Sequence, residues 1–137
     1  MENNIIKIIQ DFLRFLNERD LENLTNLFSD NLDWYIPGDE SNVEWLGKRK
    51  NRQEVAEFYN LLWKNTEPLT AKINNIFTDK ETGVIIGEFT TKMLVTNKIL
   101  HSMFCIEIQI QNNKIVKYRL LEDSFAVSQA MTNVLRE

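Results

Sequence analysis

The main hydrophobic period of this chain changes at Pro68. Before Pro68, apolar residues recur every three or four positions, which is typical of amphipathic helices. After Pro68, apolar and polar residues alternate in runs separated by short polar turns, which is typical of β-strands. Turns this short join antiparallel neighbours. The chain is therefore expected to fold as a cone-shaped α+β protein, with a curved antiparallel sheet wrapped around N-terminal helices.

Three helices are predicted before Pro68. The first spans residues 3–18, where apolar side chains gather on one side. Asp20 can cap a second helix, whose apolar side extends to Phe28. Asn51, followed three positions later by a glutamate, matches a capping box at the start of the third.

Strands are predicted on both sides of the third helix. Residues 31–36 carry aromatic and branched side chains without helical spacing, so a short strand is expected, and Pro37-Gly38 ends it. After the third helix, four longer strands are predicted, with the sequences AKINNIFTD, GVIIGEFTTKMLV, KILHSMFCIEIQI and KIVKYRLLE. A last helix follows these strands; Ser124 can cap it, and its apolar side reaches Val134.

Composition narrows the classes of function. With 137 residues and no linker or repeat, residues 1–137 are expected to form a single domain. A net charge of −4 argues against a nucleic-acid-binding surface, and the basic cluster from Lys48 to Arg52 is either a solvated turn or a small anion or partner patch. One histidine and one cysteine cannot make a zinc site, and Cys105 lies in a run of β-formers, as a buried thiol does. Neither a metal nor a cofactor is expected.

The apolar runs of the chain are short. None approaches the roughly 18 residues of a membrane span. Met1 is followed by Glu2 and two asparagines, unlike the basic and then apolar start of a secretory signal. The expected location is therefore the cytoplasm, with no membrane partner.

Three segments of the chain, in this order, resemble the nuclear transport factor 2-like superfamily, in its SnoaL-like and ketosteroid-isomerase-like branch. They are FLNERDLENLTNLFSDNLDWYIPG, WLGKRKNRQEVAEFYNLL and NKIVKYRLLEDSFAV. The resemblance covers nearly the whole chain and implies the cone-shaped fold of that superfamily. It implies no single activity, because the fold hosts isomerases, cyclases, hydrolases, dehydratases and proteins that only bind or dimerise.

The resemblance can be tested against the residues of ketosteroid isomerases. Those enzymes use an aspartate base, with a tyrosine and a protonated aspartate as donors to the enolate oxygen. Phe12 stands at or near the tyrosine position, and Ile36 stands before the proline where the base belongs. The strand of residues 98–111 contains no aspartate. Steroid isomerase chemistry is therefore not expected.

Two neighbouring carboxylates end the last predicted strand. The resemblance to SnoaL-like polyketide cyclases implies an acidic base near this position, and Asp123 matches it. A carboxylate that faces an apolar interior has a raised pKa, which suits the removal of a proton from an acidic C–H group. Asp123 also abuts the last helix and could instead be its N-cap. Glu122 should face the opposite side of the strand, and it is the candidate if the register differs.

His101 and Arg119 are the other catalytic candidates. Alternation places His101 on the same face as Met103 and Cys105. If that face is concave, the histidine could act as acid, base or hydrogen-bond donor; otherwise it is structural or lies near a dimer face. Arg119 shares a face with Asp123. It could orient a carboxylate or bind an anionic group, as an arginine does in related epoxide hydrolases, or form a surface ion pair.

The predicted elements leave a conical interior, because a long helix crosses the concave face of a curved sheet. Side chains or a ligand must fill that interior. Trp45 follows a polar loop and is expected either to form a lid or wall of a pocket, or to fill the cone itself. Aromatic residues in such a place are core or ligand contacts. The predicted ligand-binding residues are Phe12, Trp34, Ile36, Trp45, Phe58 and Trp63.

Three functions remain open at this point. The first is an enzyme of the cyclase, isomerase or hydrolase type that acts on an apolar or aromatic compound, with Asp123 as base and His101 or Arg119 assisting. The second is a protein that binds such a compound without catalysis. The third is an interaction domain that uses its outer sheet face. In each case a homodimer through that face is expected, since both faces of the strands carry apolar residues.

Overall fold

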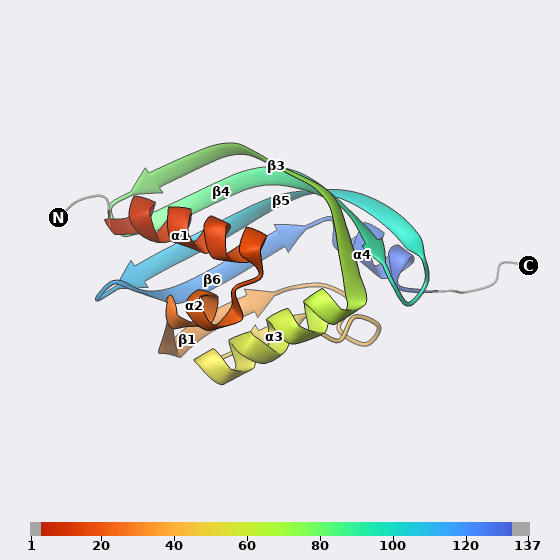
Figure 1. The fold of residues 1–137 in the computed structure, drawn as a ribbon, viewed down its shortest axis with the longest axis horizontal. Coiled ribbons are helices and arrows are strands. Elements are labelled where there is room, and N and C mark those ends of the chain that lie inside the picture. The colour runs from red at the N-terminus through yellow and green to blue at the C-terminus, as the bar shows by residue number, and fades with distance from the viewer. Residues whose placement is uncertain (1–3, 133–137) are drawn as a thin grey trace, which may run out of the picture.

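The computed structural model describes residues 4–132 and shows the α+β fold that the sequence predicts (Figure 1). No helix in that range is long and apolar enough to cross a membrane. The helices are α1 (Asn4–Glu18), α2 (Leu21–Asn26), α3 (Arg52–Asn65) and α4 (Ser124–Ala130). The strands are β1 (Phe28–Ile36), β2 (Gly47–Arg49), β3 (Thr66–Asp79), β4 (Thr82–Met93), β5 (Lys98–Gln111) and β6 (Lys114–Glu122).

The six strands form one sheet in the order β2-β1-β6-β5-β4-β3. From β3 to β6, each strand pairs with the next in antiparallel register, as the short turns predict. β1 pairs in parallel with β6, so the sheet is mixed and not purely antiparallel as expected. The parallel pair arises because the chain leaves β1, passes through β2, α3 and three further strands, and returns beside β1 only at β6. Such a return is a crossover and not a hairpin.

The two edge strands differ most from the sequence prediction. β3 begins at Thr66 and runs through Pro68, whereas the pattern predicts a start near Ala71. A proline is tolerated there because β3 is an edge strand, and its pairing with β4 shifts register beside the proline. The sequence does not predict β2, since three residues are too few to show alternation.

The long helices α1 and α3 lie on the same side of the sheet (Figure 1). α1 buries Ile5, Ile8, Ile9 and Phe12, which lie on one side of the helix as their spacing predicts. It approaches β4 closely at Gly83, where a β-carbon would collide with the side chain of Ile9. Glycine at this position therefore allows the helix to cross the sheet at short range.

Two of the three predicted N-caps are formed. Asp20 and Asn51 each accept a hydrogen bond from the backbone amide three residues later, at 3.3 and 2.9 Å. The cap of α4 is Asp123 and not Ser124, which is the first residue of the helix. Val134, the predicted end of its apolar side, lies outside the described residues.

Four aromatic side chains pack between α1, β1 and β6. Phe12, Phe28, Trp34 and Tyr118, which we call the aromatic cluster, are each at most 3% exposed. Trp34 stacks on Tyr118 with the ring centroids 4.1 Å apart, and Phe28 lies 5.6 Å from Trp34. The second helix ends at Asn26, earlier than predicted, because Phe28 enters this cluster as the first residue of β1.

Candidate functional site

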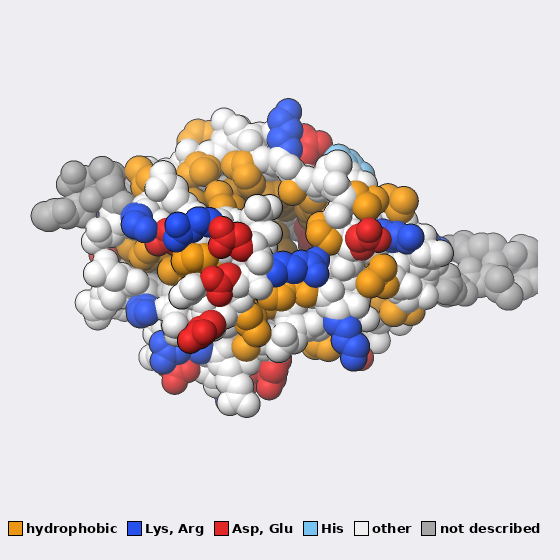
Figure 2. Space-filling view, viewed as in Figure 1, with side chains coloured by type: hydrophobic (Ala, Val, Ile, Leu, Met, Phe, Trp, Pro, Cys, Tyr) orange, Lys and Arg blue, Asp and Glu red, His pale blue; other side chains and the backbone are white. Residues whose placement is uncertain are grey.

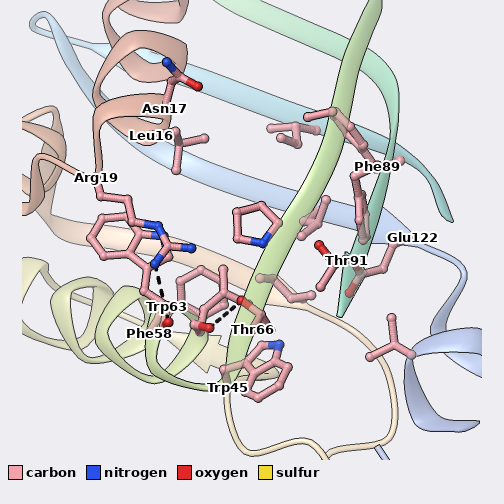
Figure 3. Close-up of a pocket in the computed structure, with 18 of the residues that line it drawn as sticks. Leu16, Asn17, Arg19, Trp45, Phe58, Trp63, Thr66, Phe89, Thr91 and Glu122 are labelled. Carbon is pink, nitrogen blue, oxygen red and sulfur yellow. Dashed lines mark hydrogen bonds between the residues drawn. The ribbon is translucent and has the colours of Figure 1, made fainter. Parts of the chain in front are cut away.

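A cavity of about 520 Å³ lies between the long helices and the sheet. Figure 2 shows hydrophobic side chains around a hollow in the middle of this face, and Figure 3 shows the side chains that surround it. α1 and α3 supply one wall, and β3 to β6 supply the other. Most of the lining residues are apolar; the aromatic ones are Trp45, Phe58, Trp63, Phe89 and Phe104.

Residues 37–46, which we call the mouth loop, close one end of the cavity. Trp45 of this loop lines the cavity and is 4% exposed, so it forms a wall and leaves the interior open. The loop is attached to α4 through Asp39, which accepts a hydrogen bond of 2.6 Å from Ser128 Oγ. This hydrogen bond and others within the loop hold the pKa of Asp39 below its usual value.

Glu122 is the one carboxyl group among the described lining residues. It is the last residue of β6 and stands opposite Phe104 of β5, with Val127 of α4 also in the wall. Among residues 4–132, no side chain or amide donates a hydrogen bond to it, and no cation forms an ion pair with it. Burial raises the pKa of Glu122 to about 7, and the negative charge of Asp123 adds to the shift.

The raised pKa gives Glu122 a specific chemical capacity. A group with a pKa near the working pH is present both as a base and as an acid, which is the condition for efficient general acid–base catalysis. A carboxyl group at a surface position is almost fully ionised at neutral pH and is a weak base. Desolvation by the apolar wall is therefore what makes this glutamate a candidate proton carrier.

The other polar groups of the lining are few. Asn17, Arg19, Thr66 and Thr91 line the cavity (Figure 3). The Thr66 hydroxyl is occupied, since it donates to the Leu62 carbonyl at 2.6 Å. Among the residues that the structure describes, no group of three or more His, Cys, Asp or Glu side chains could hold a metal ion.

Arg19 has an unusual backbone conformation. It follows the last residue of α1 with φ of 53°, in the left-handed region. That region costs a residue with a side chain about 1–2 kcal/mol relative to the right-handed one, and glycine is the usual choice there. Its guanidinium lies 5.6 Å from the Trp63 ring centroid and donates to the Trp63 carbonyl at 3.5 Å.

Asp123, the candidate base from the sequence, lies outside the cavity. It is exposed, and its carboxylate accepts a hydrogen bond of 3.0 Å from the amide of Ala126. The role of helix N-cap therefore explains the position of the Asp123 carboxylate. The register of β6 turns the side chain of Glu122, and not that of Asp123, toward the cavity. Sequence alternation could not decide between them, because Leu120 and Leu121 before them are both apolar.

His101 lies on the outer face of the sheet, with its side chain 58% exposed. Its Nε2 atom is 3.1 Å from Glu88 Oε1, and its Nδ1 atom is 3.0 Å from the Thr90 hydroxyl. The concave face of β5 is formed by the alternate positions, among them the buried Leu100 and Ser102. The structure does not bring His101 to the cavity.

Arg119 also points away from the cavity. Its Nη2 atom lies 2.9 and 3.0 Å from the two carboxylate oxygens of Asp33, and Nη1 donates to the Asp33 carbonyl at 3.0 Å. This hydrogen bonding holds the pKa of Asp33 below its usual value. The pair connects β6 to β1, which is a structural role.

Four of the six residues predicted to contact a ligand line the cavity. They are Ile36, Trp45, Phe58 and Trp63. The other two, Phe12 and Trp34, belong to the aromatic cluster, where neighbouring rings cover them. The lining residues Phe89 and Phe104 come from strands, and choosing them from the sequence would require knowing which strand face is concave.

The comparisons with known proteins agree with the fold. The sequence model of the SnoaL-like domain family matches residues 9–118. The chain belongs to the SnoaL-like domain family. A search of curated proteins found no match.

Solved structures show that this SnoaL-like chain shares its fold with proteins whose names indicate different functions. A nuclear transport factor 2-like protein from Burkholderia xenovorans is 17% identical, with 96% of this chain and 98% of that chain covered and a TM-score of 0.87. A candidate isomerase from Rhodopseudomonas palustris is 21% identical, with 95% and 97% covered and a TM-score of 0.79. An LEH-like epoxide hydrolase from M. tuberculosis is 13% identical, with 95% and 90% covered and a TM-score of 0.73.

Proposed function

We propose that this SnoaL-like protein binds a small apolar or aromatic molecule in its cavity and transfers a proton to or from it through Glu122. The observation that carries the proposal is a single carboxyl group, with a pKa of about 7, in a mostly apolar wall. Glu122 thus takes the role that the sequence suggests for Asp123. Two fold relatives, one named as a candidate isomerase and one as an LEH-like epoxide hydrolase, support small-molecule chemistry on this fold.

The proposed step is a proton transfer at an acidic C–H group of the bound molecule. The Glu122 carboxylate takes the proton, the electron pair of the C–H bond moves into an adjacent carbonyl as an enolate, and Glu122 becomes a carboxylic acid. It can return the proton to the same carbon or to another one, which gives exchange or isomerisation. The apolar walls keep water from the carboxylate and so maintain its basicity. No metal or cofactor takes part in this step.

Hydrogen–deuterium exchange tests the step without knowledge of the natural substrate. The probe is 2-tetralone, a bicyclic aromatic ketone with acidic C–H groups, in D₂O at pD near 7.5. We expect the wild-type protein to accelerate the loss of its C–H proton signals in ¹H NMR. Glu122→Gln should reduce this acceleration by about 100-fold or more, which is the usual contribution of a general base.

Asp123→Asn is the matched control, because it changes the neighbouring carboxylate that caps α4. Exchange should continue in that variant at nearly the wild-type rate. If Glu122→Gln kept the exchange and Asp123→Asn lost it, the assignment of the base would be wrong. Binding of 2-tetralone without any exchange would support the alternative of a protein that only binds ligands, and absence of both would overturn the proposal.

We also propose a homodimer through the outer face of the sheet. Three exposed apolar side chains, Ile99, Met103 and Leu121, lie on that face, and Phe125 of α4 lies beside them. Met103 is 74% exposed and Phe125 is 73% exposed, which is costly for a surface that stays in water. Light scattering should therefore give the mass of a dimer at micromolar concentration.

The variant Met103→Glu tests the dimer, since it places a charge in the centre of this apolar patch. We expect it to be monomeric. Gln53→Glu, on the exposed side of α3, adds the same charge far from the patch and should remain dimeric. A wild-type protein that is monomeric at these concentrations would contradict the proposal.

A further inference from the structure

The described lining of the cavity carries one cation and one carboxyl group. The cation is Arg19, at the end of α1, and the carboxyl group is Glu122, at the end of β6. Figure 3 shows the two on opposite sides of the cavity, with aromatic and aliphatic side chains between them. A molecule that fills this space meets a positive charge at one end and the proton carrier at the other.

Arg19 is not paired with a carboxylate among the residues that the structure describes. Other arginines do form such pairs, at 3.2 Å between Arg14 and Asp11 and at 2.9 Å between Arg119 and Asp33. Arg19 makes one long hydrogen bond, of 3.5 Å, to the Trp63 carbonyl. Because a guanidinium has five N–H donors, most of its capacity to bind an anion is unused.

The local backbone does not explain why an arginine stands at position 19. The amide of Arg19 donates to the Leu16 carbonyl at 3.2 Å, and the amide of Asp20 donates to the Phe15 carbonyl at 3.0 Å. This pair of bonds is a Schellman helix end, in which the left-handed residue is usually glycine. An arginine there accepts backbone strain, and its side chain is held over the cavity by the Trp63 ring.

We propose that the cavity binds an apolar molecule with a single negative charge, of the aromatic carboxylate class, and that Arg19 pairs with its anionic group. The inference rests on the proposed function and names the substrate class for the same site. The planar fork of a guanidinium matches a carboxylate, whose two oxygens can accept parallel hydrogen bonds. The aromatic body then lies along Phe89 and Phe104, and the reacting carbon lies toward Glu122.

A second anionic group on the ligand would be disfavoured. Beyond Arg19, the polar groups of the described lining are Asn17, two threonines and Glu122, and none of these carries a positive charge. A negative group at the far end would also lie near the carboxylate of Glu122. The charges of the lining therefore favour a ligand with a single anionic group, and they favour the orientation in which that group lies at Arg19 and not at Glu122.

Matched pairs of ligands test the inference. The probes are benzoate and benzamide, 2-naphthoate and 2-naphthamide, and 4-phenylbenzoate and 4-phenylbenzamide, titrated by calorimetry at pH 7 and low salt. Each pair has nearly the same shape and differs in its charge. We expect the wild-type protein to bind the best carboxylate about fivefold more tightly than its amide, the upper range for a partly exposed ion pair.

Two substitutions at Arg19 separate charge from folding. Arg19→Gln removes the charge, and Arg19→Gly removes it while relieving the strained backbone, so the glycine variant should melt no lower than the wild type. Both should bind carboxylate and amide equally. Arg14→Gln is the control, because Arg14 is an exposed arginine of the same helix that does not line the cavity, and it should keep the fivefold preference.

The outcomes distinguish this inference from the proposed function. If amides bind as tightly as carboxylates, or if the preference survives in both Arg19 variants, the assignment of Arg19 is overturned while the apolar site stands. If none of the six probes binds to the wild-type protein, the proposed binding function fails as well. A preference that disappears in Arg14→Gln too would indicate a general charge effect and would also overturn the assignment.

Discussion

The aromatic cluster and the cavity share α1, β1 and β6, yet one is filled and the other is hollow. In the cluster, the ring centroid of Phe12 of α1 lies 6.4 Å from that of Phe28 of β1 and 6.0 Å from that of Tyr118 of β6. One and four residues later in α1, Leu13 and Leu16 line a cavity of about 520 Å³. In the aromatic cluster, aromatic rings pack against one another, whereas in the cavity, aromatic and aliphatic side chains surround open space.

The comparison shows that apolar and aromatic composition does not by itself distinguish a core from a binding site. The cluster is filled because β1 brings Phe28 and Trp34 beneath α1. Near the cavity, the mouth loop and α4 close only the end, so no side chain reaches the centre. Walls that face a void lack contacts on one side, and they contribute less to stability than close-packed rings.

The largest expected effect is therefore in the cluster. Trp34→Ala should lower the free energy of unfolding by about 3–5 kcal/mol, because it removes a fully buried ring and leaves a hole. Trp63→Ala, in the cavity wall, should cost about 1–2 kcal/mol, since its ring is only partly buried. Urea denaturation of both variants measures the difference. Equal losses would mean that the cavity wall is as well packed as the cluster.

A second prediction uses the single carboxyl group of the cavity. The pKa of Glu122 is about 7 in the folded protein, above its ordinary value of 4.5, so the folded state holds this proton more tightly than the unfolded state. The resulting stability is fully present below pH 4.5 and is lost as the pH rises through 7. Glu122→Gln cannot ionise, and it should gain about 2 kcal/mol over the wild type between pH 5 and pH 8.

Unfolding of the wild type and Glu122→Gln in urea at pH 5, 6, 7 and 8 measures this gain. Other titrating groups are common to both proteins and cancel in the difference. A difference that stays constant with pH would show that Glu122 ionises at its ordinary pKa, and the cavity wall would then not be dry.

The smallest expected effect concerns the neighbour of Glu122. Asp123→Ala should lower the free energy of unfolding by about 1 kcal/mol, the usual contribution of a helix N-cap. The loss should become slightly smaller between pH 6 and pH 8, because removing Asp123 also removes its repulsion of the ionised Glu122. Asp123→Ser, which can still cap, should recover most of it. If urea denaturation gave the same loss for Asp123→Ser as for Asp123→Ala, the N-cap would not be the source of the stability.

Much of the fold follows from local patterns in the sequence. The four long strands, the first and third helices, and the caps Asp20 and Asn51 are where periodicity and capping chemistry predict them, apart from the early start of β3 at Thr66. The three-residue strand β2 and the early end of α2 are not predicted. Both depend on pairing with distant parts of the chain, and local spacing does not report such pairing.

The candidate site was predicted less completely, for a related reason. Ile36, Trp45, Phe58 and Trp63 line the cavity, as the aromatic and apolar character of these segments suggests. The catalytic candidates His101, Arg119 and Asp123 all point away from it. His101 and Arg119 lie on strands one position away from inward-facing residues, and Asp123 directly follows the inward-facing Glu122, so a shift of one residue changes the face.

The sequence by itself determined that this chain is an α+β protein of one family, because periods, turns and caps act between residues a few positions apart. Only the tertiary structure decided that Glu122 faces the cavity while Asp123 caps a helix. The side of β6 that becomes the interior is set by the side on which α1 and α3 pack and by pairing with β1 and β5. The chemistry of this protein depends on that choice of face, since one carboxylate is desolvated by it and the next remains in water.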